Sequence, residues 1–143
     1  NLSEKFDKYG VLNAIEFKSK IKSFKEHLDL YKMIDLSLDT FPYNGVTTSF
    51  ESLWMGVPVV TLKGNRHISR VGTTILKNLN MDELIAENDK DYVNKIIALS
   101  KNIDQLKYYQ KNLRDMMKNS VLCNGKNFTT KIEEAYTKIF NEN

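Results

Sequence analysis

The chain has 143 residues, enough for one domain or part of one, and its 41% hydrophobic and 27% charged residues are typical of a folded protein. Its 21 basic and 18 acidic residues leave a net charge of only +3, which gives no electrostatic indication of nucleic-acid binding. No apolar run approaches the roughly 20 residues that span a bilayer, and the single Cys123, which excludes an internal disulfide, favours a reducing, cytoplasmic setting.

The first part of the chain alternates helical and strand patterns. Residues 2–9 predict a helix that a glycine ends, and residues 13–18 contain the strand-like run AIEF. A helix follows, in which Ser23 and Glu26 have the spacing of a capping box. Residues 34–39, IDLSLD, then predict a strand that ends at a turn.

The next helix is predicted to begin near Thr48 and to continue to Met55. Residues 57–62, VPVVTL, are apolar on both faces, as a buried parallel strand requires. Ser69 is expected to cap a further helix that continues through Leu79. This alternation predicts an α/β fold with a small parallel sheet of three or four strands.

Helical patterns follow the run ELIA at residues 83–86, after which no strand pattern appears. Helices are predicted over residues 91–101 and 104–118, and an apolar stripe from Phe128 to Phe140 predicts a last helix. Three further large side chains are expected in the core: Tyr31, Trp54 and Met55.

Residues 1–143 are therefore predicted to form one domain, with an α/β part over about 11–86 and a helical cap over about 87–143. The apolar stripes of the cap could cover the sheet. Because so small a parallel sheet rarely stands alone, at least one edge is expected to continue into more chain. In the isolated chain the same edge would favour association with another copy.

The segment PYNGVTTSFESLWMGVPVVT, between two predicted strands, has the parts of a phosphate cradle. Ligands of parallel α/β sheets bind outside the carboxyl ends of the strands. Asn44 and Gly45 permit positive φ, the next helix exposes free N–H groups, and Thr47 and Thr48 add hydroxyl donors. The same residues also have a purely structural explanation, because Thr48 and Glu51 have capping-box spacing and Asn-Gly is a common turn.

Other side chains could complete a nucleotide site. Glu51, one turn into its helix, could accept hydrogen bonds from ribose hydroxyls. His27 follows the loop of residues 18–22 and could contact a base, or it could be an ordinary surface histidine. The run GNRHISR places His67 and Arg70 where they could approach a diphosphate, or simply lie in a solvated loop.

Two stretches, IDLSLDTFPYNGVTTSFESLWMGVPVVTL and SRVGTTILKNLNMDELIA, resemble the O-GlcNAc transferase and SPINDLY family of protein O-glycosyltransferases. The similarity extends from about residue 17 to residue 140. It implies that the chain is the C-terminal part of a Rossmann-like, nucleotide-binding lobe of the GT-B type. Family members usually carry tetratricopeptide repeats before two such lobes, and this chain contains neither the repeats nor the first lobe.

The resemblance implies a set of contacts to a nucleotide-sugar donor. His27 matches a family histidine near the donor base, and Thr47 and Thr48 match diphosphate-binding threonines. Glu51 matches a ribose-binding acid, which is Asp in animal O-GlcNAc transferases and Glu in SPINDLY-like proteins. Val46 departs from the animal sequence NGHTT, and the donor-phosphate lysine of the family lies upstream. The complete set of expected donor contacts is Lys22, His27, Asn44, Gly45, Thr47, Thr48, Glu51, His67 and Arg70.

The function implied by the resemblance is nucleotide-sugar binding within an enzyme that transfers GlcNAc from UDP-GlcNAc to Ser or Thr of an acceptor protein. The runs LDTFPY and CNG favour an alternative, a SPINDLY-like O-fucosyltransferase that uses GDP-fucose. A non-catalytic module that binds a nucleotide or a protein is the other alternative. Neither nucleic acid nor membrane is expected as a partner. No cofactor or metal is expected, because a helix N-terminus and hydroxyls can stabilise a leaving diphosphate.

Overall fold

The computed structural model describes residues 1–18 and 21–142. At its centre is a three-stranded parallel sheet, formed by β1 (Ser37–Leu38), β2 (Val59–Leu62) and β3 (Ile85–Ala86) in that order. The register pairs are Ser37 with Val59, Leu38 with Val60, Thr61 with Ile85 and Leu62 with Ala86. The α/β fold with a small parallel sheet is confirmed, and so is a buried strand within residues 57–62, although it begins at Val59.

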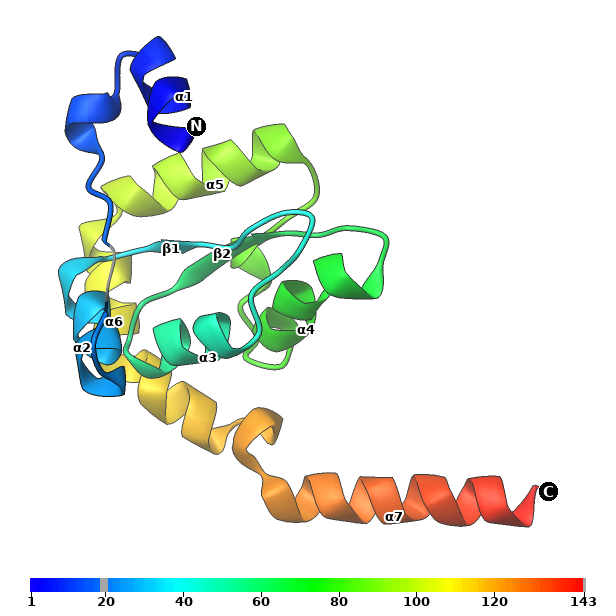
Figure 1. Ribbon diagram of the computed structural model, residues 1–143. Coiled ribbons are helices and arrows are strands. Elements are labelled where there is room, and N and C mark those ends of the chain that lie inside the picture. Colours follow the sequence, from blue (N-terminus) through cyan, green and yellow to red (C-terminus); the bar gives the residue numbers. More distant parts are fainter. Residues whose placement is uncertain (19–20, 143) are drawn as a thin grey trace.

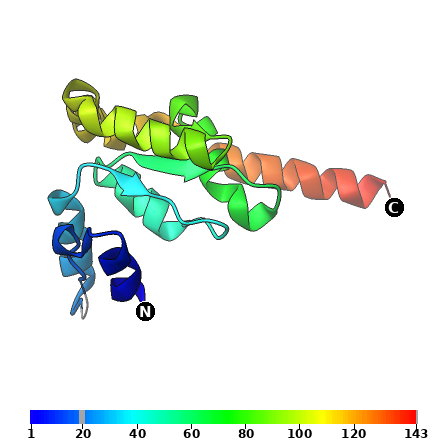
Figure 2. The same ribbon diagram turned by 90° about the horizontal axis from the view of Figure 1, so that it is seen from above.

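Helices cover both faces of this sheet, as Figures 1 and 2 show. On one face lie α3 (Thr47–Trp54) and α4 (Val71–Lys77), and on the other lies α5 (Asp89–Lys101). The long helix α6 (Ile103–Asn119) contacts both α5 and α3. Coverage from both sides explains why all four residues of β2 are buried and apolar or hydrogen-bonded.

The core lies between the sheet and these helices. Leu53 of α3, Leu76 of α4 and Leu113 of α6 are at most 1% exposed. Burial of a leucine side chain contributes about 2 kcal/mol to folding, so these three contacts hold the helices firmly. Tyr109 is also buried, and its hydroxyl donates to a carboxylate oxygen of Glu83 at 2.5 Å.

Shorter elements complete the chain. The N-terminal helices are α1 (Leu2–Lys8) and α2 (Phe24–Leu30), and α7 (Gly125–Asn141) is the last helix. Gly10 has φ of +68°, which confirms it as the residue that ends the first helix. Among the described residues, five single turns of 3₁₀ helix lie between the helices and strands: Leu12–Ala14, Tyr31–Met33, His67–Ser69, Asp82–Leu84 and Val121–Cys123.

The strand predicted over residues 13–18 is wrong. Leu12–Ala14 form a 3₁₀ turn, and residues 15–18 belong to no strand. A strand requires a neighbour to bond, and within residues 1–18 and 21–142 no strand pairs with the outer edge of β1. The loop predicted over residues 18–22 can be placed only in part, because residues 19 and 20 lie outside the described residues.

The predicted capping box at the start of α3 is wrong. The helix begins at Thr47, one residue earlier than predicted, and its N-cap, Val46, provides no side-chain hydrogen bond. The Glu51 carboxylate bonds a histidine of another helix instead of the backbone at the start of its own. The first turn of α3 therefore keeps backbone donors that a capping box would have satisfied.

The predicted start of α4 is also wrong. Its N-cap is Arg70, and the helix begins at Val71. Ser69 lies in the preceding turn, where its hydroxyl donates to the carbonyl oxygen of Arg66 at 3.1 Å. Serine competes for nearby backbone groups in turns as readily as at helix starts, which accounts for the shift.

Trp54 is not a core residue as predicted, because its side chain is 37% exposed. Two cations of α6 lie over its ring instead, with Arg114 at 5.5 Å and Lys118 at 5.9 Å from the ring centroid. The guanidinium of Arg114 also donates through Nε to the carbonyl oxygen of Trp54 at 2.9 Å. The ring therefore joins α3 to α6 at the protein surface.

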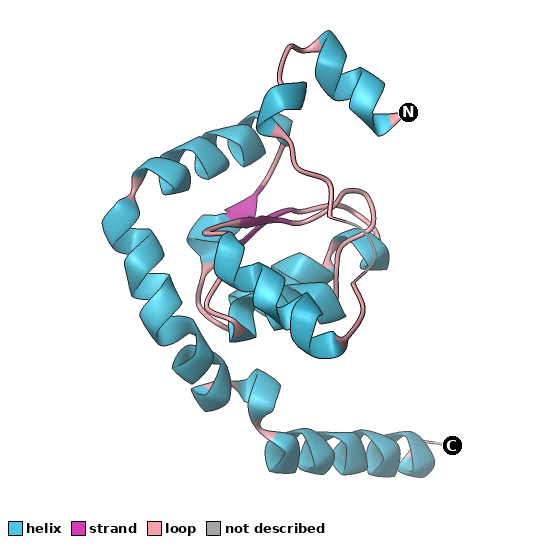
Figure 3. Cartoon of the chain, turned by 60° about the vertical axis from the view of Figure 1, so that its left-hand side comes forward, coloured by secondary structure: helices cyan, strands magenta, loops and turns pink. Residues whose placement is uncertain are grey.

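The last helix does not cover the sheet as predicted. The helices α5 and α6 confirm the patterns over residues 91–101 and 104–118, but α7 contacts the turn Val121–Cys123 and leads away from the sheet (Figures 1 and 3). Phe128, Tyr136 and Phe140 on its apolar stripe are 65%, 69% and 83% exposed. In the part of the chain that the structure describes, no helix has the length and apolarity needed to cross a membrane.

Candidate functional site

A buried carboxylate organises the loop that follows β1. Asp39 is 8% exposed, and its Oδ1 accepts from the N–H of Gly45 at 2.7 Å. Its Oδ2 accepts from the hydroxyl of Thr61 at 2.7 Å, and its carbonyl oxygen accepts from the hydroxyl of Tyr92 at 2.9 Å. Burial raises the pKa of the Asp39 carboxyl, and hydrogen bonds from Thr61 and Gly45 oppose this rise. Sequence reasoning missed Asp39, although an acid at the end of an apolar run was a visible signal.

Asn44 turns inward and connects this loop to α4. Its side chain is 1% exposed, donates to the Thr40 carbonyl oxygen at 3.0 Å and accepts from the Gly72 N–H at 3.3 Å. Neither Asn44 nor Gly45 has the positive φ that their sequence permits. A Cβ at Gly45 would instead lie closer than van der Waals contact to Oγ1 of Thr48, so any larger residue here would displace the Thr48 hydroxyl.

The first turn of α3 has backbone donors at the carboxyl end of the sheet that no described residue accepts from. Its first intrahelical bond runs from the N–H of Phe50 to the carbonyl oxygen of Val46, so the N–H groups of residues 47–49 precede the hydrogen-bonded part. Thr47 and Thr48 are exposed, whereas Ser49 is buried and donates to the Gly45 carbonyl oxygen at 3.0 Å. Eight residues of aligned peptide dipoles favour an anion at this end.

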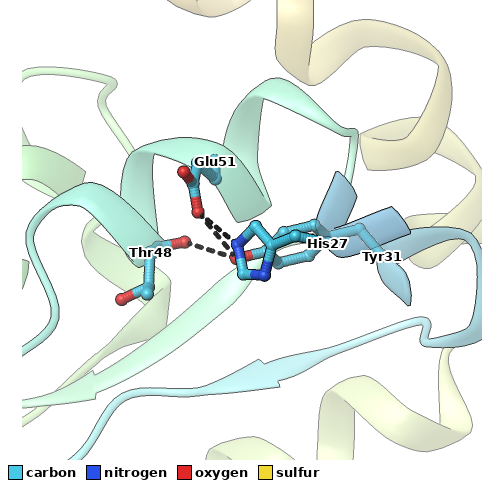
Figure 4. A network of polar contacts seen from close by, with 4 residues as sticks. All are labelled: His27, Tyr31, Thr48 and Glu51. Atoms are coloured by element: carbon cyan, nitrogen blue, oxygen red, sulfur yellow. Dashed lines mark hydrogen bonds and ion pairs between the residues drawn. The ribbon is translucent and has the colours of Figure 1, made fainter. Parts of the chain in front are cut away.

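Two of the predicted nucleoside contacts meet beside this turn (Figure 4). Nε2 of His27, from α2, lies 2.8 Å from Oε2 of Glu51, from α3, although the two residues are 24 positions apart. Their side chains are 31% and 16% exposed, so both remain within reach of a ligand. Phe24 stacks beside the imidazole with 6.3 Å between ring centroids.

Tyr31 completes the same network. Its hydroxyl lies 3.2 Å from the carbonyl oxygen of Thr48 and 3.4 Å from Oε2 of Glu51, as Figure 4 shows. Burial, reinforced by the Glu51 carboxylate, raises the pKa of Tyr31 to about 12. Sequence reasoning placed this residue in the core because it continues the apolar face of its helix, and nothing in that spacing shows that its hydroxyl is used.

No hydrogen bond among the described residues joins Lys22, His67 or Arg70 to this network. Lys22 is exposed, and its backbone N–H donates to the Glu26 carboxylate at 2.9 Å. His67 and Arg70 are exposed on the loop after β2. That loop lies beside the loop after β1, because the N–H of Asn44 donates to the carbonyl oxygen of Ile68 at 2.8 Å. Among the residues described, no three His, Cys, Asp or Glu side chains gather as a metal site would require.

Comparisons with known proteins agree with one another. Residues 1–132 match the family Glycosyl transferase family 41. The chain is 42% identical over 115 residues to "Probable UDP-N-acetylglucosamine--peptide N-acetylglucosaminyltransferase SPINDLY" of Solanum lycopersicum, covering 80% of this chain and 12% of that protein. The Arabidopsis thaliana protein of the same name is 40% identical over 115 residues, with 80% and 13% covered.

The chain is also similar to a solved structure of a glycosyltransferase. The chain superposes on a mutant of Thermobaculum terrenum O-GlcNAc transferase with a TM-score of 0.89 and 31% sequence identity, covering 99% of this chain and 27% of that one. The "UDP-N-acetylglucosamine--peptide N-acetylglucosaminyltransferase" of Caenorhabditis elegans is 35% identical over 88 residues, which is 62% of this chain and 8% of that protein. The chain thus spans about 12% of the length of the SPINDLY proteins it matches.

Proposed function

This chain belongs to glycosyl transferase family 41, and from that premise we propose that it forms the donor-binding part of a protein O-glycosyltransferase. The intact protein would transfer GlcNAc from UDP-GlcNAc to Ser or Thr side chains of an acceptor protein. The names of the relatives from Solanum lycopersicum and Caenorhabditis elegans support this donor. The similarity to a solved O-GlcNAc transferase supports the location of the site within the fold.

The observation that carries the proposal is the contact between His27 and Glu51. Both were expected to bind the nucleoside, and they come from separate helices to a distance of 2.8 Å beside the first turn of α3. Thr47 and Thr48 begin that helix, and Glu51 follows one turn later. A diphosphate at the helix start would therefore place its ribose near the Glu51 carboxylate and its base toward His27.

The proposed chemistry requires mainly electrostatic stabilisation. The bond between the sugar C1 and the diphosphate oxygen breaks while the acceptor hydroxyl oxygen bonds to C1 and loses its proton. The negative charge that develops on the diphosphate faces the N–H groups of residues 47–49 and the Thr47 and Thr48 hydroxyls, which are donors held in place before the reaction begins. We assign no catalytic base within these 143 residues. The proposal includes no metal or other cofactor, and it places the reaction in the cytoplasm on the basis of the single Cys123.

A binding experiment on the intact protein tests the nucleotide site. His27→Ala should weaken binding of UDP or GDP about twofold to tenfold, because one hydrogen bond to an uncharged base contributes about 0.5–1.5 kcal/mol. The melting temperature should change little, because the ring is partly exposed. Lys25→Ala, at an exposed position of the same helix, is the control and should leave binding unchanged. Unchanged nucleotide affinity in a folded His27→Ala protein would refute the proposal.

A donor panel tests the sugar. We expect the intact protein to transfer GlcNAc from UDP-GlcNAc to a Ser/Thr-rich acceptor, measured by the mass added to the acceptor. The alternative is fucose transfer from GDP-fucose, which is favoured by Glu51 in place of the Asp of animal enzymes and by the run LDTFPY. Fucose transfer without GlcNAc transfer would replace the first proposal. Nucleotide binding without transfer of either sugar would support a non-catalytic module.

A further inference from the structure

We propose that Tyr31 is a positioning residue of the nucleoside site, whose hydroxyl holds Glu51 so that one carboxylate oxygen faces the ribose. This inference rests on the proposed function. Tyr31 belongs to the 3₁₀ turn after α2, whereas Glu51 belongs to α3, so the contact also joins the two elements that provide the site. No sequence motif assigns Tyr31 a part in binding.

The two carboxylate oxygens of Glu51 have different hydrogen-bond partners. Nε2 of His27 lies 2.8 Å from Oε2, and the Tyr31 hydroxyl lies 3.4 Å from the same atom. The phenol has a single hydrogen, which it shares between Oε2 and the carbonyl oxygen of Thr48 at 3.2 Å. Among residues 1–18 and 21–142, both side chains that hydrogen-bond Glu51 do so at Oε2, which leaves Oε1 to accept from a ribose hydroxyl.

The same contacts fix the orientation of the His27 ring. A carboxylate oxygen accepts hydrogen bonds, so Nε2 of His27 carries the hydrogen in this contact. The edge of Tyr31 meets the imidazole at an interplanar angle of 86° with 5.6 Å between centroids. The ring of Tyr31 thus restricts the plane of the imidazole, while its hydroxyl restricts the carboxylate.

Tyr31 keeps this function at every pH at which proteins usually work. Burial, followed by the neighbouring Glu51 carboxylate, raises the pKa of Tyr31 to about 12, so the hydroxyl remains a donor. A cavity of about 80 Å³ borders Tyr31, Thr48 and Asp39. Removal of the Tyr31 hydroxyl would enlarge this cavity by the volume of one oxygen atom. The contact between the Tyr31 ring and His27 would remain.

A purely structural tyrosine predicts a different result from a positioning one. If the hydroxyl only joins α3 to the turn after α2, its removal lowers stability and weakens every nucleotide to the same extent. If it orients Glu51, its removal weakens a nucleotide only when that nucleotide carries the ribose hydroxyls. Removing the Tyr31 hydroxyl and removing the ribose hydroxyls can therefore be combined in one thermodynamic cycle, which measures the coupling between them.

The experiment measures dissociation constants of the intact protein by calorimetry for the tighter of UDP and GDP and for its 2′,3′-dideoxy analogue. Tyr31→Phe should weaken the ribonucleotide about fivefold, the usual effect of one hydrogen bond to a charged group, and should leave the dideoxy analogue unchanged. In a Glu51→Gln background, Tyr31→Phe should have no further effect. Tyr108→Phe, which removes an exposed phenol hydroxyl of α6, is the matched control and should change neither ligand.

The outcomes separate this inference from the proposed function. Equal weakening of both nucleotides by Tyr31→Phe, or no weakening of either, would overturn the positioning role while leaving Glu51 as a ribose contact. Unchanged binding in Glu51→Gln would instead refute the ribose contact of the proposed function, whatever Tyr31 does. A drop in melting temperature without the difference between the two nucleotides would identify Tyr31 as structural.

Discussion

The hydroxyls of the first turn of α3 can be removed with little change to the helix, because Thr47 and Thr48 are exposed and valine has nearly the same shape. Thr47→Val together with Thr48→Val should weaken nucleotide diphosphate binding by about 1–3 kcal/mol, the effect of losing charge-assisted hydrogen bonds. Calorimetry with the intact protein measures this change.

The chain offers a matched control for the threonine pair. Thr129 and Thr130 also lie in the first turns of a helix, and their hydroxyls donate to the carbonyl oxygens of Gly125 and Lys126. Valine at both positions should leave nucleotide binding unchanged. If the pair in α3 behaved like the pair in α7, the phosphate cradle would be disproved.

Asp39 should make stability depend on pH in the direction opposite to most carboxylates. Burial raises its pKa above the ordinary value of 3.8, so the folded protein holds this proton more tightly than the unfolded chain does. Its contribution is complete below 3.8 and is lost as the pH rises through the raised value. The hydroxyl of Tyr92 faces the same residue, but burial and Asp39 raise the pKa of Tyr92 still further from this range.

Asp39→Asn isolates this effect, because the amide keeps an oxygen for the Gly45 N–H but cannot ionise. Melting temperatures of the wild type and the variant should be compared from about pH 4 to about pH 7, the range in which buried carboxyls titrate. The wild type should lose stability relative to Asp39→Asn as the pH rises. A relative stability that increases with pH would contradict the burial argument.

Side chains of the site could be predicted where their chemistry is read from local sequence. Thr47, Thr48 and Glu51 stand in a recognisable segment, and a histidine near a loop is an obvious candidate for ligand contact. Asp39 and Tyr31 were missed because their roles depend on partners 6 to 22 positions away along the chain, such as Gly45, Thr48 and Thr61. Hydrogen bonds of this kind are set by tertiary packing, which periodicity does not encode.

At the scale of elements, the end of α3 is fixed by α6. The guanidinium of Arg114 donates to the carbonyl oxygen of Trp54, one of the groups that a helix end leaves unsatisfied, and lies over the Trp54 ring. Arg114→Ala should reduce the free energy of unfolding by about 1 kcal/mol, the combined effect of one hydrogen bond and one exposed cation–π contact.

Lys111→Ala serves as the control for Arg114, because Lys111 is an exposed cation on the same helix. Both variants lose one positive charge, so a difference between them reports the contact with Trp54 rather than net charge. Chemical denaturation measures both. Equal stability of the two variants would show that α6 does not hold α3 through this arginine.

Helices and strands could be predicted where the apolar pattern of the sequence fits only one kind of secondary structure. The strand β2 is apolar on both faces, and α5 and α6 carry clear helical stripes, so all three were found. Residues 13–18 have a strand composition but no partner strand in the described part of the chain, and a pattern alone cannot supply one. The helix α7 was found, but its direction away from the sheet depends on a short turn that no stripe predicts.

At the scale of the whole molecule, apolar surface remains exposed in the isolated 143-residue chain. Phe128 and Phe140 of α7 are 65% and 83% exposed, and in the described part of the chain no strand pairs with the outer edge of β1. We expect this chain, produced by itself, to self-associate and to transfer no sugar. Light scattering should show a mass above that of a monomer, and Phe128→Ser with Phe140→Ser should lower it.

The isolated chain should also be compared with the intact protein in the transfer assay. Asn124→Ser, at the start of α7, keeps the apolar stripe and serves as the control for the two phenylalanine substitutions. A strictly monomeric chain that transferred sugar would contradict both expectations at once. It would place the catalytic group among residues that are assigned here to donor binding or to the core.

The hydrogen bond between His27 and Glu51 also allows the site to be followed by NMR without attaching a probe to the protein. The chain has two histidines, and the second, His67, is exposed at the start of the turn His67–Ser69. In a sample enriched with ¹⁵N-histidine, the Nε2 signal of His27 would report the hydrogen bond to Glu51 directly. Movement of the His27 signals alone during a nucleotide titration would give a direct spectroscopic record of the site filling.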